Sequence, residues 1–272
     1  MMKVTKKTTM EIHKENILIQ DNKTNHLSAH AVKLLDCLYY NIQRMINHQK
    51  KKNENIDNIE NILLKHFDKK PLFLNVKQTD IKEWIGLEKE KNYTKSIRDA
   101  ITELTINIEL KNYIDEEGNA IRWALKSFIK TVSEGKSKID NKTIIYKMEI
   151  DKTLLNLIIL LKKGYTPINL EYQKSWKGVN TIRLYQYIKS IQNMKIKPTH
   201  DIKWFNEYFA PKTKLKYLSK CVEILNRNIK TINNDADVVI ILVVDKASKT
   251  FTFDIKSKNV VMGDIGKLAK PF

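Results

Sequence analysis

The chain has 272 residues, of which 42% are hydrophobic, and its 49 basic residues exceed the 31 acidic ones to give a formal net charge of +18. This composition supports one large or two ordinary folded domains and argues against a disordered chain. The longest apolar runs, 154–161 and 238–244, are far shorter than the roughly 20 residues that span a bilayer, and the charged N-terminus has no apolar segment behind it. We therefore expect a soluble protein that stays inside the cell and has no membrane partner.

The positive charge favours a polyanionic partner, because basic side chains release the counterions condensed on a nucleic acid. Only five of the 49 basic residues are arginine, and the chain is rich in lysine, asparagine and isoleucine. An AT-rich coding bias is the alternative source of the lysines. That bias explains the excess of lysine over arginine, but it explains less well why acidic residues fail to balance the charge. Nucleic acid is therefore the predicted partner.

The first half of the chain alternates helical and strand patterns. It begins with a long helix over 28–43 capped by Ser28, a loop or frayed helix over 47–58 and a strand over 72–76. A short helix over 78–85, ended by Gly86, and a third helix over 92–105 follow. The last predicted elements are a hairpin over 106–125 and a strand pair, 127–132 and 143–150, around a turn at Gly135. Ile97, Ile101 and Leu104 are expected on the inner face of the third helix.

The second half repeats this order. Its predicted elements are a helix over 178–193, a short helix over 201–209 stopped by Pro211, a third helix over 213–230, and a hairpin of strand 238–244 and a strand from Phe251. Three helices followed by a hairpin are typical of a winged helix, in which the second and third helices form a helix-turn-helix.

The predicted fold class is therefore α+β, with two tandem winged-helix domains. The expected divisions are an N-terminal tail (1–26), a first domain (27–163) for dimerisation and auxiliary DNA contact, a second domain (164–257) for main DNA recognition, and a C-terminal tail (258–272).

The chain resembles the replication initiator family of iteron-containing bacterial plasmids from about Leu27 to Lys256. The resemblance is strongest in NTIRLYQYIK (180–189) and KYLSKCVEILNRNIKTINNDADVVI (216–240). It implies a plasmid initiator that binds direct repeats in double-stranded origin DNA as a monomer and represses its own gene as a dimer. It also implies a dimer contact in the first domain, host replication initiator and helicase proteins as partners, and a location in the bacterial cytoplasm with the plasmid.

The helix predicted over 213–230 is the expected recognition element. Its apolar face carries Leu218, Val222, Leu225 and Ile229. Its outward ridge carries Thr213, Lys216, Lys220, Glu223 and Arg227, with Lys212 and Lys214 at the N-terminal end. Lysine and arginine pair with guanine, glutamate accepts from cytosine, and a helix N-terminus suits phosphate. A merely solvated lysine face is the alternative, but the position in a helix-turn-helix favours DNA.

The first domain is expected to contact DNA less strongly, because the ridge of its third helix has mixed charge. Its predicted contacts are Asn92, Lys95 and Arg98. The strands 127–132 and 143–150 either offer an edge for self-association or lie inside the sheet. In the second hairpin, the turn lysines Lys246 and Lys249 either follow the DNA backbone or minor groove or are simply solvated. The tyrosines and Trp84, Trp176 and Trp204 are expected to pack in cores rather than stack on bases.

The motifs argue against an enzyme. The GKS sequence at 135–137 lacks the earlier phosphate-loop glycine, which is Lys130 here, and a strand follows it. Cys37 and Cys221 are expected as buried free thiols rather than a disulfide. His26 and His30 have ligand spacing but no third ligand nearby, so we predict no metal and no cofactor. The alternatives are a two-domain transcriptional repressor and, from another class, a metal-dependent nuclease or primase.

Overall fold

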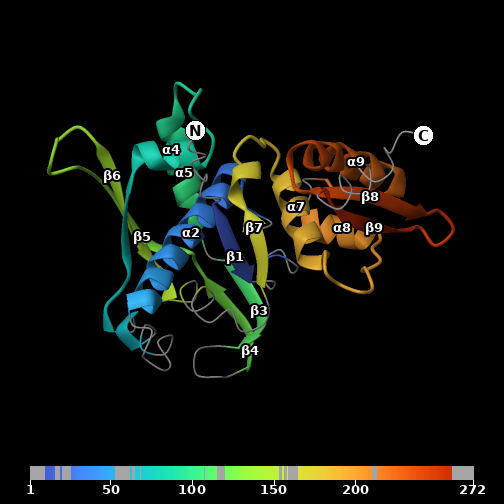
Figure 1. The fold of residues 1–272 in the computed structure, drawn as a ribbon, viewed down its shortest axis with the longest axis horizontal. Coiled ribbons are helices and arrows are strands. Elements are labelled where there is room, and N and C mark those ends of the chain that lie inside the picture. The colour runs from blue at the N-terminus through green and yellow to red at the C-terminus, as the bar shows by residue number, and fades with distance from the viewer. Residues whose placement is uncertain are drawn as a thin grey trace, which may run out of the picture. The chain divides into compact units, whose positions relative to one another are not determined.

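The structure is a computed structural model of the whole chain. It describes residues 10–15, 26–52, 69–106, 108–114, 120–152, 165–209 and 213–258, together with 19, 62, 65–67, 155 and 158. The chain forms two compact units (Figure 1). The first consists of Met1–Glu15 and Leu27–Ser175, and the second of Asn16–His26 and Trp176–Phe272. Lys212, the turn at 115–119 and residues 259–272 of the expected C-terminal tail lie outside the described residues.

Helices α2 (Ala29–Lys52), α4 (Gln78–Trp84) and α5 (Tyr93–Thr105) form the helical layer of the first unit. The Ser28 hydroxyl accepts a hydrogen bond from the Ala31 backbone N–H at 3.3 Å, which confirms the predicted N-cap. Val32, Leu34, Leu35, Leu38 and Ile42 of α2 are buried and Met45 is half-buried. Ile97, Ile101 and Leu104 of α5 are buried. Helix α2 continues through 47–52, so this part of the expected loop or frayed helix is helical.

The sheet of the first unit has the order β2–β6–β5, formed by β2 (Phe73–Lys77), β6 (Ile144–Ile150) and β5 (Ile129–Lys136). The chain thus runs helix, strand, helix, helix, strand, strand, which is the predicted winged helix. The hairpin of β3 (Ile108–Ile114) and β4 (Ala120–Lys126) is a separate two-stranded sheet inserted after α5. The wing of this unit is therefore the β5–β6 hairpin.

The expected turn at Gly135 is wrong. Gly135 lies within β5, opposite Ile145, and the turn occupies 137–143. The alternatives left open for these strands are now resolved among the described residues. Strand β6 is internal because β2 and β5 flank it, whereas β5 is the edge of the sheet.

The N-terminal segment is more than a tail. Strand β1 (Glu11–Glu15) pairs antiparallel with β7 (Tyr165–Asn169), and the facing residues Ile12 and Ile168 are both fully buried. A short 3-10 helix, η1 (Leu170–Tyr172), follows β7 in the same unit. The first compact unit extends to Ser175, because β7 completes a sheet with the N-terminal strand.

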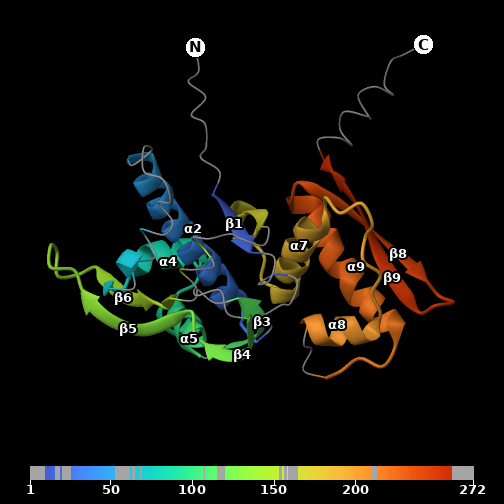
Figure 2. The same cartoon turned by 90° about the horizontal axis from the view of Figure 1, so that it is seen from below.

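The second unit contains α7 (Val179–Ile191), α8 (Ile202–Phe209), α9 (Leu218–Asp235), β8 (Val238–Asp245) and β9 (Thr250–Ser257) (Figure 2). His200, just before α8, forms an isolated antiparallel bridge with Phe251 of β9. This bridge occupies the place that β2 has beside β6 in the first unit. The two units therefore share one winged-helix topology.

Helix α9 begins at Leu218, not at residue 213 as expected, and ends at Asp235 rather than 230. The late start has a tertiary cause. The Asn206 side-chain amide of α8 accepts from the Leu215 N–H at 2.8 Å and donates to the Leu215 carbonyl at 2.9 Å. This pair fixes the segment before α9 in an extended form, and Tyr217 enters the helix from the β region, at φ −122° and ψ 130°.

Aromatic rings fill the core of the second unit. The His200 and Trp204 rings stack with centroids 3.9 Å apart, and Trp204 stacks on Tyr208 at 4.9 Å. Trp176 is buried and donates its indole N–H to Asp235 at 2.8 Å, whereas Trp84 of the first unit is half-buried. Cys37 and Cys221 are buried free thiols, as predicted. Within the described ranges, no helix is both long and apolar enough to cross a bilayer.

Candidate nucleic-acid interface

Helix α9 is anchored in its unit by one face and exposed on the other. Cys221, Leu225, Ile229 and Ile232 are buried on the inner face. The Thr181 hydroxyl of α7 donates to the Asn228 side chain at 2.7 Å, and the Asn233 side chain makes two backbone hydrogen bonds to Ile240 of β8. These contacts fix the rotation of α9 about its axis, so the direction in which its outer ridge points is determined.

The outer ridge carries one carboxylate between two cations. Glu223 accepts from the Lys220 ammonium at 2.8 Å and from the Arg227 guanidinium at 3.2 Å, and all three side chains are exposed. The hydrogen bond and charge of Lys220, helped by Arg227, lower the pKa of Glu223. Glu223 therefore organises the two cations in the free protein, and base contacts by any of the three would rearrange this triad.

The expected N-terminal part of the ridge lies outside the helix. Thr213, Lys214 and Lys216 are exposed in the segment that connects α8 to α9. They therefore lie in the turn between α8 and α9, not on α9 itself. Their charge still lies beside the start of α9, where Tyr217 provides no side-chain hydrogen bond to the first turn. The first amides of a helix have no carbonyl partner one turn earlier in the helix, so a helix start of this kind suits an anion.

The sequence interpretation missed four exposed residues of this surface. Tyr217 is 70% exposed at the start of α9, although the tyrosines were expected to pack in cores. Ser219, Asn226 and Lys230 are exposed along the helix. Asparagine can pair with adenine through two hydrogen bonds. The three helical residues lie within the helix predicted over 213–230, so examining every position away from its apolar face would have identified them.

The wing of the second unit has a rigid turn. The Asp245 carboxylate accepts from the Ala247 N–H at 2.9 Å, the Ser248 N–H at 3.3 Å and the Ser248 hydroxyl at 2.7 Å. These hydrogen bonds, with that of the Ser248 hydroxyl the largest, lower the pKa of Asp245. Lys246 and Lys249 are both exposed on this turn, and Lys249 has a left-handed backbone at φ 55°.

The corresponding surface of the first unit carries fewer available cations. Asn92 and Lys95 are exposed at the start of α5. Arg98 donates two hydrogen bonds to the Glu134 carboxylate on β5, at 2.9 and 2.8 Å. This bidentate pair joins α5 to the wing, so a phosphate contact by Arg98 must compete with Glu134.

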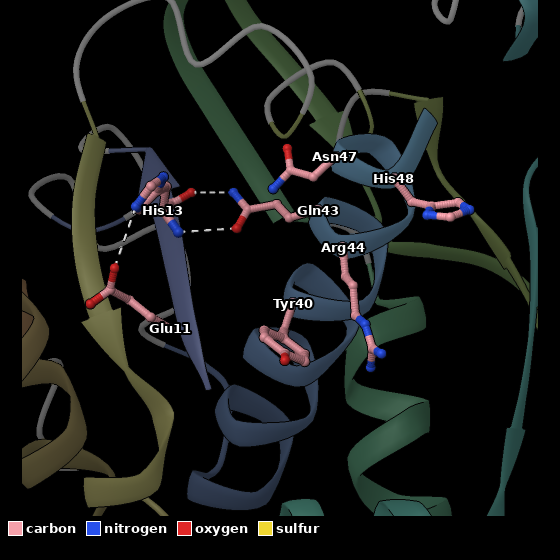
Figure 3. Close-up of a pocket in the computed structure, with 7 residues that line it drawn as sticks. All are labelled: Glu11, His13, Tyr40, Gln43, Arg44, Asn47 and His48. Atoms are coloured by element: carbon pink, nitrogen blue, oxygen red, sulfur yellow. Dashed lines mark hydrogen bonds and ion pairs between the residues drawn. The ribbon is translucent and has the colours of Figure 1, made fainter. Parts of the chain in front are cut away.

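A polar cavity of about 340 Å³ lies between β1 and α2 of the first unit (Figure 3). The residues that line it are Glu11, His13, Tyr40, Gln43, Arg44, Asn47 and His48. Gln43 donates to the His13 carbonyl at 2.6 Å and accepts from the His13 N–H at 3.0 Å, which ties β1 to α2. Across the described ranges, no three His, Cys, Asp or Glu side chains lie together in a metal-binding arrangement.

The comparisons with known proteins agree with this architecture. The family model described as "Initiator Replication protein, WH1" matches residues 11–189, more than half of the chain. The fold is similar to that of the Pi initiator protein, whose crystal structure is in complex with iteron DNA. The two share 15% sequence identity over 92% of this chain and 98% of that chain, with a TM-score of 0.59. No curated protein matches the chain.

The family match confirms the predicted resemblance to replication initiators, and the shared topology of the two units confirms the winged-helix fold class. The likeness to the Pi initiator, at 15% identity, concerns the fold. The chain belongs to the initiator replication protein family.

Proposed function

We propose that this initiator binds direct repeats in double-stranded plasmid origin DNA, with α9 inserted in the major groove. The observation that carries the proposal is the exposed ridge of Lys220, Glu223 and Arg227 on the third helix of a winged-helix unit. An α-helix fits the major groove, and basic side chains there pair with guanine. The similar Pi initiator protein has been crystallised with iteron DNA, which supports repeats as the target.

In this proposal, the residues of the second unit divide into two roles. Arg227 and Lys220 contact bases. Glu223 either accepts a hydrogen bond from cytosine or holds the two cations in place. Thr213, Lys214, Lys216 and the wing residues Lys246 and Lys249 contact phosphates, because they lie beside the helix rather than on it. Lys212 belongs to the same group by its place in the sequence. Phosphate contacts set affinity and register, whereas base contacts set specificity.

The first unit assists binding through Asn92, Lys95 and Arg98 and carries the self-association surface. Strand β5 is an edge of its sheet among the described residues, and an edge strand can pair with a second copy of itself. We propose that the monomer initiates replication and that the dimer represses the protein's own gene. Host initiator and helicase proteins join the complex in the bacterial cytoplasm, and the chain itself acts by binding and straining DNA without covalent chemistry.

Binding measurements on repeat and scrambled duplexes test the roles of the residues. Arg227→Ala should relax the preference at one base pair, at a cost of about 1–3 kcal/mol for the correct base. Lys216→Ala and Lys212→Ala should weaken binding to every sequence alike and reduce the salt dependence by about one phosphate contact each. Equal effects of all three variants on specific and random DNA would contradict this division.

Two further experiments separate the initiator from the other candidates. A plasmid with the origin fragment should replicate only when the gene is supplied, whereas a repressor would be dispensable for replication. Supercoiled origin DNA incubated with the protein and Mg²⁺ or Mn²⁺ should remain uncut. Cleavage that disappears with a single-site variant would show a nuclease instead.

A further inference from the structure

The wing of the first unit extends beyond the rest of its unit. Only Ile129 of β5 is buried, and all residues from Lys130 to Lys136 are exposed. Because neighbouring residues of a strand point to opposite faces, both faces of β5 are in solvent. Figures 1 and 2 show the β5–β6 hairpin projecting away from α4 and α5. The hairpin therefore presents its turn, residues 137–143, far from the core of its own unit.

The turn is held in one conformation by its own hydrogen bonds. The Asp140 carboxylate accepts from the N–H groups of Lys142 and Thr143, at 3.1 and 3.0 Å, and from the Thr143 hydroxyl. These bonds, led by that of Thr143, lower the pKa of Asp140 to about 2, so the carboxylate is charged at neutral pH. Asn141 has φ 50° and donates its N–H to the Ser137 carbonyl at 2.9 Å.

This turn presents an apolar side chain at its tip. Ile139 is 98% exposed, the highest exposure among the large hydrophobic residues in the described part of the chain. Its backbone is fixed by a hydrogen bond from its N–H to the Ser137 hydroxyl at 3.1 Å, and Ser137 is itself buried. A flexible loop could turn an isoleucine inward, but this turn holds it outward.

Lysines surround Ile139, and the carboxylates of the hairpin are already engaged. Glu134 pairs with Arg98, Glu149 pairs with Lys130 at 3.4 Å, and Asp140 closes the turn. Lys147 lies over the Phe73 ring, 4.3 Å from its centroid. Three lysines at the end of the hairpin pair with no carboxylate of the described residues. They are Lys136, Lys138 and Lys142.

We propose that this tip is a second DNA-binding site, in which Ile139 enters the minor groove as a wedge between base pairs while Lys138 and Lys142 contact the phosphates on either side. Apolar wedges in the minor groove unstack a base step and bend the duplex, at a cost of a few kcal/mol per step. Flexible TA steps need the least energy for this. The inference rests on the proposed function and adds to it a means of opening an AT-rich segment.

The charge pattern favours DNA over a second protein chain as the occupant. A protein partner would bury several apolar side chains in a continuous patch, whereas here one isoleucine stands between cations. The three lysines carry the charge opposite to that of the phosphates on both rims of a groove, and a preformed turn loses little entropy when it binds.

The test uses the full chain and origin duplexes in which 2-aminopurine replaces adenine at one position at a time. The fluorescence of 2-aminopurine rises when the base loses its stacking neighbours. The wild-type protein should raise it at one step beside the repeat. Ile139→Ser should remove this rise and weaken binding about 5- to 10-fold, because the loss of one buried apolar side chain is partly offset by the unstacking cost that is no longer incurred.

Two further variants locate the effect. Val132→Ala changes another exposed apolar residue of the same hairpin, on strand β5 and away from the tip, where it is 39% exposed; this variant should leave both the fluorescence and the affinity unchanged. The double variant Lys138→Gln, Lys142→Gln should make the slope of log affinity against log salt concentration shallower by about 1.8, since each phosphate contact contributes about 0.9.

Three outcomes would overturn the inference while leaving the proposed function intact. The first is that the wild type binds the repeats with no 2-aminopurine signal at any position. The second is that Ile139→Ser binds and unstacks like the wild type. The third is that Ile139→Ser changes the oligomeric state in light scattering without altering the fluorescence. The last result would assign the tip to self-association. Failure of the wild type to prefer repeats over random DNA would instead overturn the proposed function.

Discussion

Lys14 and Asp36 form an ion pair that is closed to solvent: the ammonium lies 2.8 Å from the carboxylate, and the two side chains are 0% and 1% exposed. Lys14 belongs to β1 and Asp36 to α2. The pair fixes the N-terminal strand to the longest helix of the first unit. Two buried charges lose their hydration, and their mutual attraction offsets much of that cost.

Removal of one member of this pair should therefore be costly. Lys14→Ala leaves the Asp36 carboxylate buried without its cation and should lower the free energy of unfolding by about 3–5 kcal/mol. The double variant Lys14→Met, Asp36→Leu should recover most of this loss, because no buried charge remains. Urea unfolding followed by circular dichroism measures both. Lys130→Ala is the control: its side chain is 66% exposed in the pair with Glu149, so the change should alter stability by less than about 1 kcal/mol. Equal effects of Lys14→Ala and Lys130→Ala would contradict the argument.

Gly86 should not tolerate a side chain. Its φ is +77°, and a Cβ placed on it would lie 2.3 Å from the Lys174 carbonyl oxygen. Both the left-handed backbone and the clash with backbone atoms oppose alanine, so Gly86→Ala should cost at least about 2 kcal/mol in thermal or urea unfolding. Gly135 of β5 has nothing within 4 Å of the equivalent position. Gly135→Ala should therefore be neutral or slightly stabilising, and a comparable loss at both glycines would refute the steric explanation.

The second unit should lose stability in mild acid through His200. Its Nε2 lies 2.7 Å from the Tyr187 hydroxyl, and burial lowers its pKa to about 4, only partly opposed by Asp201. The unfolded chain binds a proton near pH 6.5 and the folded one only near pH 4. Above pH 6.5 the ring is neutral in both states, so His200 costs the folded protein nothing. As the pH falls from 6.5 towards 4, only the unfolded chain takes up the proton, and the free energy of unfolding decreases.

The expected loss is about 2 kcal/mol, after allowance for solvent screening of a shift of this size. Thermal unfolding of the full chain between pH 4 and 7.5 measures it. His200→Gln has no titratable ring, so its stability should fall less steeply over this range, even though its stability at pH 7.5 is lower. Parallel pH profiles of variant and wild type would show that His200 is not the group responsible.

Neutralising Glu223 should strengthen non-specific DNA binding. Glu223→Gln releases Lys220 and Arg227 from their shared carboxylate and makes the ridge of α9 more positive. Affinity for random duplex should rise, and the salt slope should steepen by about 1–2 phosphate contacts, while the ratio of specific to random binding falls. Fluorescence anisotropy over a series of KCl concentrations measures this. Glu207→Gln, on the exposed face of α8, is the control. No difference between the two variants would show that the triad does not act on DNA.

The sequence alone determined the elements and their order. Apolar spacing located the helices α2, α5 and α7, the buried face of α5 and the three strand pairs, because helical and strand periodicities are properties of neighbouring residues. On α9 it identified Leu225 and Ile229 as buried, but Leu218 and Val222 are only half-buried. Gly86 correctly marked the end of α4, since few other residues adopt its backbone angles. The repeated order of three helices and a hairpin was enough to indicate two winged helices.

The pairing of the strands and the start of α9 became clear only from the tertiary structure. Local periodicity does not reveal that β1 pairs with β7, that β6 rather than β3 or β4 pairs with β2, or that Asn206 delays the start of α9 to Leu218. Each of these depends on contacts between residues that are distant in sequence, or on side-chain hydrogen bonds that override local preference. For the same reason the sequence identified the cations of the candidate site, but not which of them stand on the helix, which lie in its turn, and which are held by a carboxylate.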